Sequence, residues 1–136
     1  TKIVLDILRL PHPPAHQIGH PLHAVRIVTH IALKSATGWT TYRPGVVDTG
    51  AAVSLLPRES WESAEYQVVG EVRIGGINAR PECRIAAKLS NVTIALSDGQ
   101  SVIGQIPIRA YLADSNEVPL LIGLCDLLER GRLMID

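Results

Sequence analysis

The most informative stretch of the chain is residues 45–57, which read GVVDTGAAVSLLP. Two branched aliphatic residues lead into Asp48, and Thr49 and Gly50 follow before the chain becomes apolar again. A carboxylate between apolar flanks is poorly solvated unless something uses it, so Asp48 is the first candidate for chemistry. The alternative is an inert turn, since Asp, Thr and Gly are all common in turns.

Two further segments downstream attract attention. Residues 119–123 read PLLIG, and the run from residue 124 to residue 130 predicts a short helix that ends at Gly131, because glycine is favoured just past a helix end. Between residues 45–57 and residues 119–123, residues 74–77 read IGGI. This pattern alone indicates no more than a glycine-rich hairpin tip.

The rest of the chain carries mainly strand signals, because aliphatic residues recur with a period of two and long helical periods are missing. Strands are predicted in residues 24–33, 71–74, 83–89, 92–96, 102–108 and 133–135. Asp98-Gly99 is typical of a tight hairpin, a turn is expected after Pro57, and residues 11–21 predict an irregular loop. The sequence therefore predicts an all-β fold, a small barrel or sandwich with one short C-terminal helix.

The composition favours one soluble domain over all 136 residues, and 46% of these are hydrophobic. The 13 basic and 13 acidic residues balance, so neither nucleic acid nor an anionic membrane surface is an expected partner. No signal peptide is visible in the first residues. A cytoplasmic location is favoured, while release from a longer or membrane-attached precursor is left open.

The cysteines and histidines give weaker candidates. Cys83 and Cys125 lie outside any CxxC spacing, so no disulfide framework or thiolate zinc site is expected, although one isolated disulfide stays open. Both are expected to be packing residues, Cys125 as a buried helix residue, and not nucleophiles. Prolines and glycines favour a solvated loop over a helical metal site for four histidines: His12, His16, His20 and His23.

Residues 46–51, VVDTGA, resemble the active loop of the retropepsin-like aspartic proteases, in which two apolar residues precede Asp-Thr-Gly-Ala. Two other segments match the family in order. An apolar-apolar-Gly element that packs beside the active loop is matched by Leu121, Ile122 and Gly123, with DLL at residues 126–128. The flap, a mobile hairpin that closes over substrate, is matched by Ile74, Gly75, Gly76 and Ile77. The resemblance covers residues 24–136.

The resemblance implies a closed β-barrel of the acid-protease type with a flap hairpin, and an endopeptidase activity that needs no metal or organic cofactor. One Asp-Thr-Gly loop per chain implies a homodimer in which two Asp48 carboxylates share a proton and activate a water molecule. Thr49 would brace the two loops across the dimer axis, Gly50 would let the backbone approach and contact substrate, and Ala51 would support the loop. The substrate would be an extended peptide or protein segment.

The resemblance also implies an interfacial sheet between protomers, formed by residues 133–136 and an N-terminal strand at residues 3–5. Two positions depart from many retroviral members, because Ala52 and Leu124 replace an acidic residue and its Arg partner. Their joint replacement suggests apolar packing in place of an ion pair. The 47 residues before Asp48 exceed the viral lead-in, so no role is transferred to residues 1–23, and cellular or bacterial members are closer.

Two other hypotheses remain from different classes. The first is a catalytically inactive module that keeps the retropepsin fold and binds peptides or dimerises. The second is a metal-binding protein that uses the histidine-rich loop.

Overall fold

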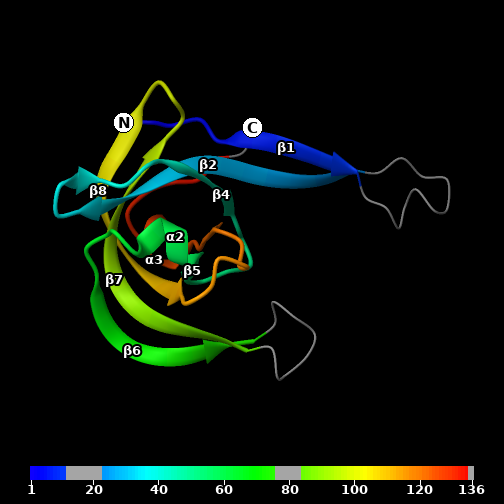
Figure 1. Ribbon diagram of the computed structural model, residues 1–136. Coiled ribbons are helices and arrows are strands. Elements are labelled where there is room, and N and C mark those ends of the chain that lie inside the picture. The colour runs from blue at the N-terminus through cyan, green and yellow to red at the C-terminus, as the bar shows by residue number, and fades with distance from the viewer. Residues whose placement is uncertain (12–22, 76–83, 135–136) are drawn as a thin grey trace, which may run out of the picture.

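The computed structural model describes residues 1–11, 23–75 and 84–134, and this part of the chain is mostly β (Figure 1). In chain order, the elements are β1 (Asp6–Pro11), β2 (His23–Ser35), β3 (Gly38–Trp39), β4 (Arg43–Val47), β5 (Ser54–Leu56), α2 (Arg58–Trp61), β6 (Gln67–Ile74), β7 (Ile85–Ser97), β8 (Val102–Ala113), β9 (Leu121–Ile122) and α3 (Cys125–Leu128). The all-β prediction is confirmed.

The strands form one sheet that closes on itself. The strand order is β1-β2-β4-β9-β5-β8-β7-β6, and β2 also pairs with β7, so the strands from β2 to β7 in that order make a ring. β1 and β6 lie outside the ring as edge strands, β1 along β2 and β6 along β7. In Figure 1 the β1–β2 and β6–β7 pairs project from the same side of the molecule.

The core lies inside the ring and follows from the alternation of side chains along the strands. In β2, Thr29, Ile31 and Leu33 are buried on one face, while His30 is exposed on the opposite face and Ala32 on that face is buried. The largest fully buried apolar side chains are those of Ile31, Leu33, Leu56, Ile94, Leu112 and Ile122. α2 forms at the turn predicted after Pro57 and adds Trp61 to the core, where the Trp61 indole N–H donates to the Ala113 carbonyl at 2.9 Å.

The predicted Asp98-Gly99 hairpin joins β7 to β8. Gly99 has a φ of +87°, which glycine adopts without strain. The Asp98 carboxylate accepts the backbone N–H groups of Ser101, Val4 and Gln100, and these hydrogen bonds lower the pKa of Asp98. The bond to Val4, 2.9 Å long, holds the N-terminal segment against the hairpin.

The strand prediction at the N-terminus is therefore wrong in its position. Residues 3–5 are not a strand: Ile3 and Leu5 pack against the core, and Val4 donates to a side chain instead of a neighbouring strand. The first strand begins at Asp6. The loop predicted for residues 11–21 lies almost entirely outside the described residues, as do His12, His16 and His20.

Three predictions for other segments also need correction. Residues 85–97 form one long strand, β7, where two strands were predicted, and Cys83 lies outside the described residues. α3 spans four residues, and Cys125 is exposed on it because Leu124 and Leu127 face the core instead. Residues 133 and 134 form no strand, and the Met134 side chain is 67% exposed. Within the described ranges, no helix has the length and apolar character needed to cross a membrane.

Candidate active site

Strand β4 delivers Asp48 to the surface at the end of a buried run. Val46 and Val47 alternate between the outer and inner faces of the ring, and Val47 is buried. Gly45 leaves room for the Leu120 side chain, since a Cβ there would lie 2.5 Å from a Leu120 methyl group. Asp48 is half-buried just past the strand, and Thr49 and Gly50 are exposed, so the loop is accessible to other molecules.

The loop folds back on the Asp48 carboxylate through backbone groups. The Gly50 N–H donates to Asp48 Oδ1 at 2.9 Å, and the Ala51 N–H donates to the Asp48 carbonyl at 3.2 Å. On the other side, the Asp48 N–H donates to the Ile122 carbonyl at 3.0 Å. These bonds fix the carboxylate at the end of β4 and orient it by one of its two oxygens.

Strand β9 brings the predicted apolar-apolar-Gly element beside this loop. β9 pairs in parallel with β4, with Val47 opposite Ile122, and antiparallel with β5, with Leu55 opposite Leu121. β9 therefore lies between the strands that precede and follow the Asp48 loop. The predicted adjacency of residues 121–123 and residues 48–51 is a feature of the structure.

Gly123 makes the closest contact between the two segments. A Cβ on Gly123 would lie 2.6 to 2.8 Å from backbone atoms of Val53, Ala52 and Ser54, closer than real Cβ atoms come. The Gly123 N–H donates to the buried Ser54 hydroxyl at 3.0 Å. Only glycine fits at this position without moving the backbone that follows the Asp48 loop.

The two positions that depart from the retroviral pattern are also joined, but not as expected. Leu124 packs against the core, whereas Ala52 is exposed, so apolar packing does not link them. Backbone hydrogen bonds hold the segments together: the Leu124 N–H donates to the Ala51 carbonyl and the Cys125 N–H to the Ala52 carbonyl, each at 3.0 Å.

An ion pair that the sequence does not predict holds α3 to β8. The Arg109 guanidinium donates to both oxygens of Asp126, at 2.9 and 3.3 Å, and the Arg109 backbone N–H donates to Oδ2 at 2.7 Å. The side-chain hydrogen bond from Arg109 lowers the pKa of Asp126, against an opposing effect of burial. The pair connects α3 to β8, and so supports the segment that bonds to the Asp48 loop. No local signal marks it, since the two residues are 17 positions apart.

Ile74 and Gly75, the described residues of the predicted flap, lie at the end of the antiparallel β6–β7 pair. The strands pair from Gln67 opposite Asn91 to Ile74 opposite Ile85. Ile74 is the last residue of β6 and Gly75 follows it, exposed, while Gly76 and Ile77 lie outside the described residues. Beneath the hairpin end, a small apolar cluster contains Leu55, Ala113 and Val118, packed against Ile74, Ile85, Tyr111 and Leu121.

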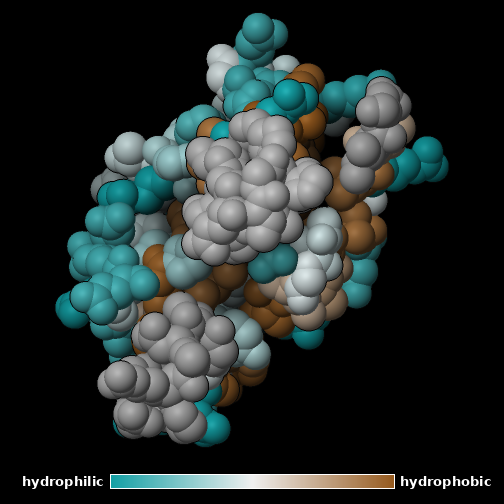
Figure 2. Space-filling view, turned by 90° about the vertical axis from the view of Figure 1, so that its right-hand side faces the viewer, coloured by the Kyte–Doolittle hydropathy of each residue, from teal (hydrophilic) through white to brown (hydrophobic). Residues whose placement is uncertain are grey.

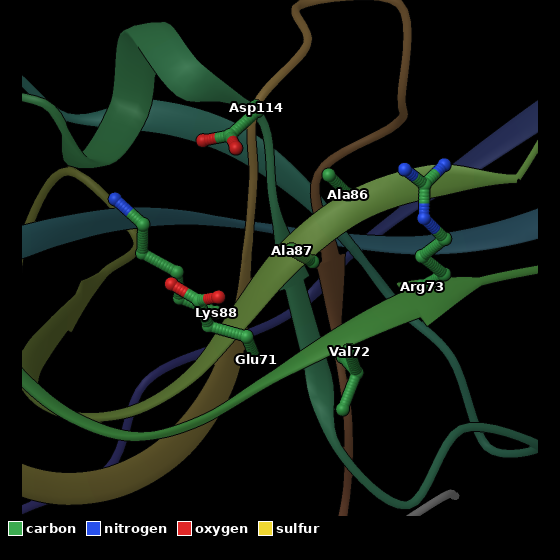
Figure 3. A pocket seen from close by; sticks show the side chains of 7 residues that line it. All are labelled: Glu71, Val72, Arg73, Ala86, Ala87, Lys88 and Asp114. Carbon is green, nitrogen blue, oxygen red and sulfur yellow. The ribbon is translucent and has the colours of Figure 1, made fainter.

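A separate recess of about 310 Å³ lies on the β6–β7 hairpin and contains none of residues 48–51 (Figure 3). It is lined by Glu71, Val72, Arg73, Ala86, Ala87, Lys88 and Asp114. Glu71 and Lys88 are cross-strand neighbours, and the Lys88 ammonium lies 5.5 Å from the centre of the Trp61 ring. This charged surface differs in chemistry from the apolar cluster under the hairpin, so we keep it apart from the candidate active site.

No protein-family model matches the chain, and no curated protein is significantly similar to it.

A Gly123→Ala substitution tests whether the close approach holds the site together. The added methyl group would meet backbone atoms that cannot move cheaply, so we expect the free energy of unfolding to fall by about 3 kcal/mol or more. Gly70→Ala is the matched control, because nothing lies within 4 Å of a Cβ at that strand position. Denaturant unfolding of the two variants measures the difference, and equal stability would contradict the tight contact.

An Asp126→Asn substitution tests the ion pair through its pH dependence. Because the pKa of Asp126 is lowered in the folded protein, its stabilisation is present above the ordinary value of 3.8 and is lost as the pH falls through the folded-state pKa. With Arg109 half exposed, we expect the variant to be about 1–2 kcal/mol less stable at pH 7. The difference between wild type and variant should shrink in acid, and a difference that is constant with pH would contradict this role.

Proposed function

We propose that this chain is an aspartic endopeptidase of the retropepsin type, active as a homodimer, whose strand ring is the acid-protease barrel. The observation that supports the proposal is the position of β9 between β4 and β5, with Gly123 against the segment that follows Asp48. An isolated Asp-Thr-Gly would be common in turns. A loop of this sequence, locked by backbone bonds to an apolar-apolar-Gly segment, is a much more specific combination.

The proposed chemistry needs two copies of Asp48. Two carboxylates about 3 Å apart cannot both ionise, so they share one proton and titrate as a coupled pair. The ionised member acts as general base toward a water molecule, and the protonated member donates to the scissile carbonyl oxygen. The water oxygen then adds to the carbonyl carbon, and the resulting tetrahedral species collapses with protonation of the leaving amine.

The loop geometry suits this role. Asp48 Oδ1 accepts the Gly50 N–H, so the carboxylate is held in one orientation by its own loop. Thr49 is exposed at the loop surface, where a second copy of the loop could meet it. Gly50 and Ala51 present backbone close to the carboxylate, and Ala51 also accepts the Leu124 N–H.

The substrate class that fits best is an extended peptide. The apolar cluster beneath the β6–β7 hairpin, which includes Leu55 and Leu121, lies next to the strands that carry the Asp48 loop. Ile74 and Ile85 of the hairpin pack on this cluster, so a peptide must take their place to lie between the hairpin and this floor. An extended chain there would make strand-like backbone hydrogen bonds and place its own apolar side chains against the cluster. We therefore propose that apolar residues flank the bond that is cleaved.

Asp48→Asn tests the catalytic role. The variant keeps an oxygen that can accept the Gly50 N–H, so we expect an unchanged fold, but it cannot share a proton as a carboxylate pair does. Cleavage of a fluorescently labelled unfolded protein such as casein should fall at least about 10³-fold, measured as kcat/KM. Circular dichroism and unfolding of the same preparation provide the control, and undiminished cleavage would rule out this mechanism.

The dependence of activity on concentration tests the shared site. If the site forms between two chains, specific activity should fall on dilution below the dimer dissociation constant and should reach a plateau above it. Sedimentation measurements on the same samples give the fraction of dimer. Full specific activity in a monomeric sample would contradict the proposal.

The inactive peptide-binding module is the remaining alternative. A statine-type transition-state analogue distinguishes the two, because only an enzyme that stabilises the transition state binds it far more tightly than the corresponding peptide. Equal affinity for the analogue and the peptide, together with no cleavage, would favour the alternative.

A further inference from the structure

The outermost part of the β1–β2 pair is a two-stranded ribbon with no neighbour on either edge within the described residues. β2 pairs with β4 only from Ile27 onward, so residues 23–26 pair with β1 alone. We call residues 8–11 and 23–26 the arm. A two-stranded ribbon is marginally stable in water, and an uncovered apolar edge strand promotes association.

The arm also exposes apolar side chains on both of its faces. Leu8 and Leu10 share one face and are 48% and 40% exposed, while Val25 lies on the other face and is 53% exposed. Ile7, at the base of the arm, is 66% exposed. Figure 2 looks onto the side of the molecule from which the arm projects, and it shows hydrophobic surface near the middle of that side.

The strand register relates the arm to the candidate active site. Ile7 is opposite Ile27 in β2, and Ile27 is opposite Val47 in β4, so these three residues form one row across the sheet. Val47 precedes Asp48, and the row places Ile7 two strand spacings away, about 10 Å. β1 and β4 run in the same direction, because each is antiparallel to β2.

The arm therefore extends past the level of Asp48. From Ile7 to the end of β1 at Pro11, four residues add about 13 Å along the direction in which β4 delivers Asp48. In Figure 1, β1 and β2 run beyond the bend between β4 and β5. A second copy that brings its own Asp48 within about 3 Å must stand directly beyond this loop, and so beside the arm.

We infer that the arm is an intersubunit clasp, whose apolar faces are covered by the second copy of this chain in the dimer. The inference rests on the proposed function, because the shared site fixes where the partner stands. Two-fold symmetry makes each chain both donor and receiver of an arm, so two arms are covered per dimer. Arg9 and Arg26 lie on opposite faces of the arm, where their long side chains can cover apolar surface while their guanidinium groups reach solvent.

Lysine substitutions on the arm test the clasp. Leu8→Lys and Val25→Lys each place a charge on one face, and Val69→Lys is the control, since Val69 is 60% exposed on the other edge strand. All three are made in the D48N chain, which cannot cleave itself by the proposed mechanism. We expect each arm variant to raise the dimer dissociation constant about tenfold or more, measured by sedimentation equilibrium. The control should stay within about twofold.

Hydrogen exchange on the chain without arm substitutions gives a second measurement that does not depend on how the variants fold. The Leu8 and Leu10 amides should be more protected at protein concentrations above the dimer dissociation constant than below it. The Val69 amide should exchange equally at both concentrations.

The outcomes separate the clasp from the proposed function. A dimer that is unaffected by both arm variants, with no concentration-dependent protection of Leu8 and Leu10, overturns the clasp and leaves the protease proposal standing. Arm variants that weaken the D48N dimer, together with an unsubstituted Asp48 chain that dimerises but cleaves no peptide, leave the clasp standing and overturn the protease. A chain that stays monomeric at all concentrations overturns both.

Discussion

The close approach of Gly123 to the backbone of residues 52–54 is the contact on which the candidate site depends. Because glycine has no side chain, β9 can lie between β4 and β5 and pair with both. The strands on either side of the Asp48 loop are then held at a fixed spacing by a segment about 75 positions later in the chain. The loop therefore takes its position from the global fold, and its own turn residues only shape it locally.

An ion pair outside the Asp48 loop also supports the position of that loop. Asp126 and Arg109 hold α3 against β8, and Leu124 and Cys125 at the start of α3 donate their backbone N–H groups to the carbonyls of residues 51 and 52. The bonds that reach the Asp48 loop itself come from backbone groups, which do not titrate. The bonds between residues 124–125 and the loop therefore use no ionisable group.

Much of the β architecture could be predicted from the sequence, because alternation along residues 24–33 and the Asp98-Gly99 turn are local signals with a direct physical cause. The adjacency of residues 48–51 and 121–123 needed the family resemblance, since no local pattern relates segments so far apart. The Asp126–Arg109 pair could not be predicted, because it depends on the register of β8 against α3. The prediction that Cys125 is buried was wrong for a related reason, because a helix of four residues is too short for a periodic pattern to indicate its buried face.

The start of the first strand shows how one side chain can override such a pattern. Residues 3–5 are apolar and suit a strand. The Val4 N–H nevertheless donates to the Asp98 carboxylate, and pairing between β1 and β2 begins only at Asp6.

Closing a sheet into a ring normally removes its edges, but here β1 and β6 are added outside the ring and recreate two. Both project on the side that carries the Asp48 loop, and they differ in chemistry. β6 exposes Val68, Val69 and Val72 at its edge but borders a recess lined largely by charged side chains, whereas the arm of β1 and β2 exposes leucine and valine on both of its faces. In the dimer proposed above, two-fold symmetry would place a second copy against both the Asp48 loop and the arm. The cost of exposing the arm would then fall only on the monomer.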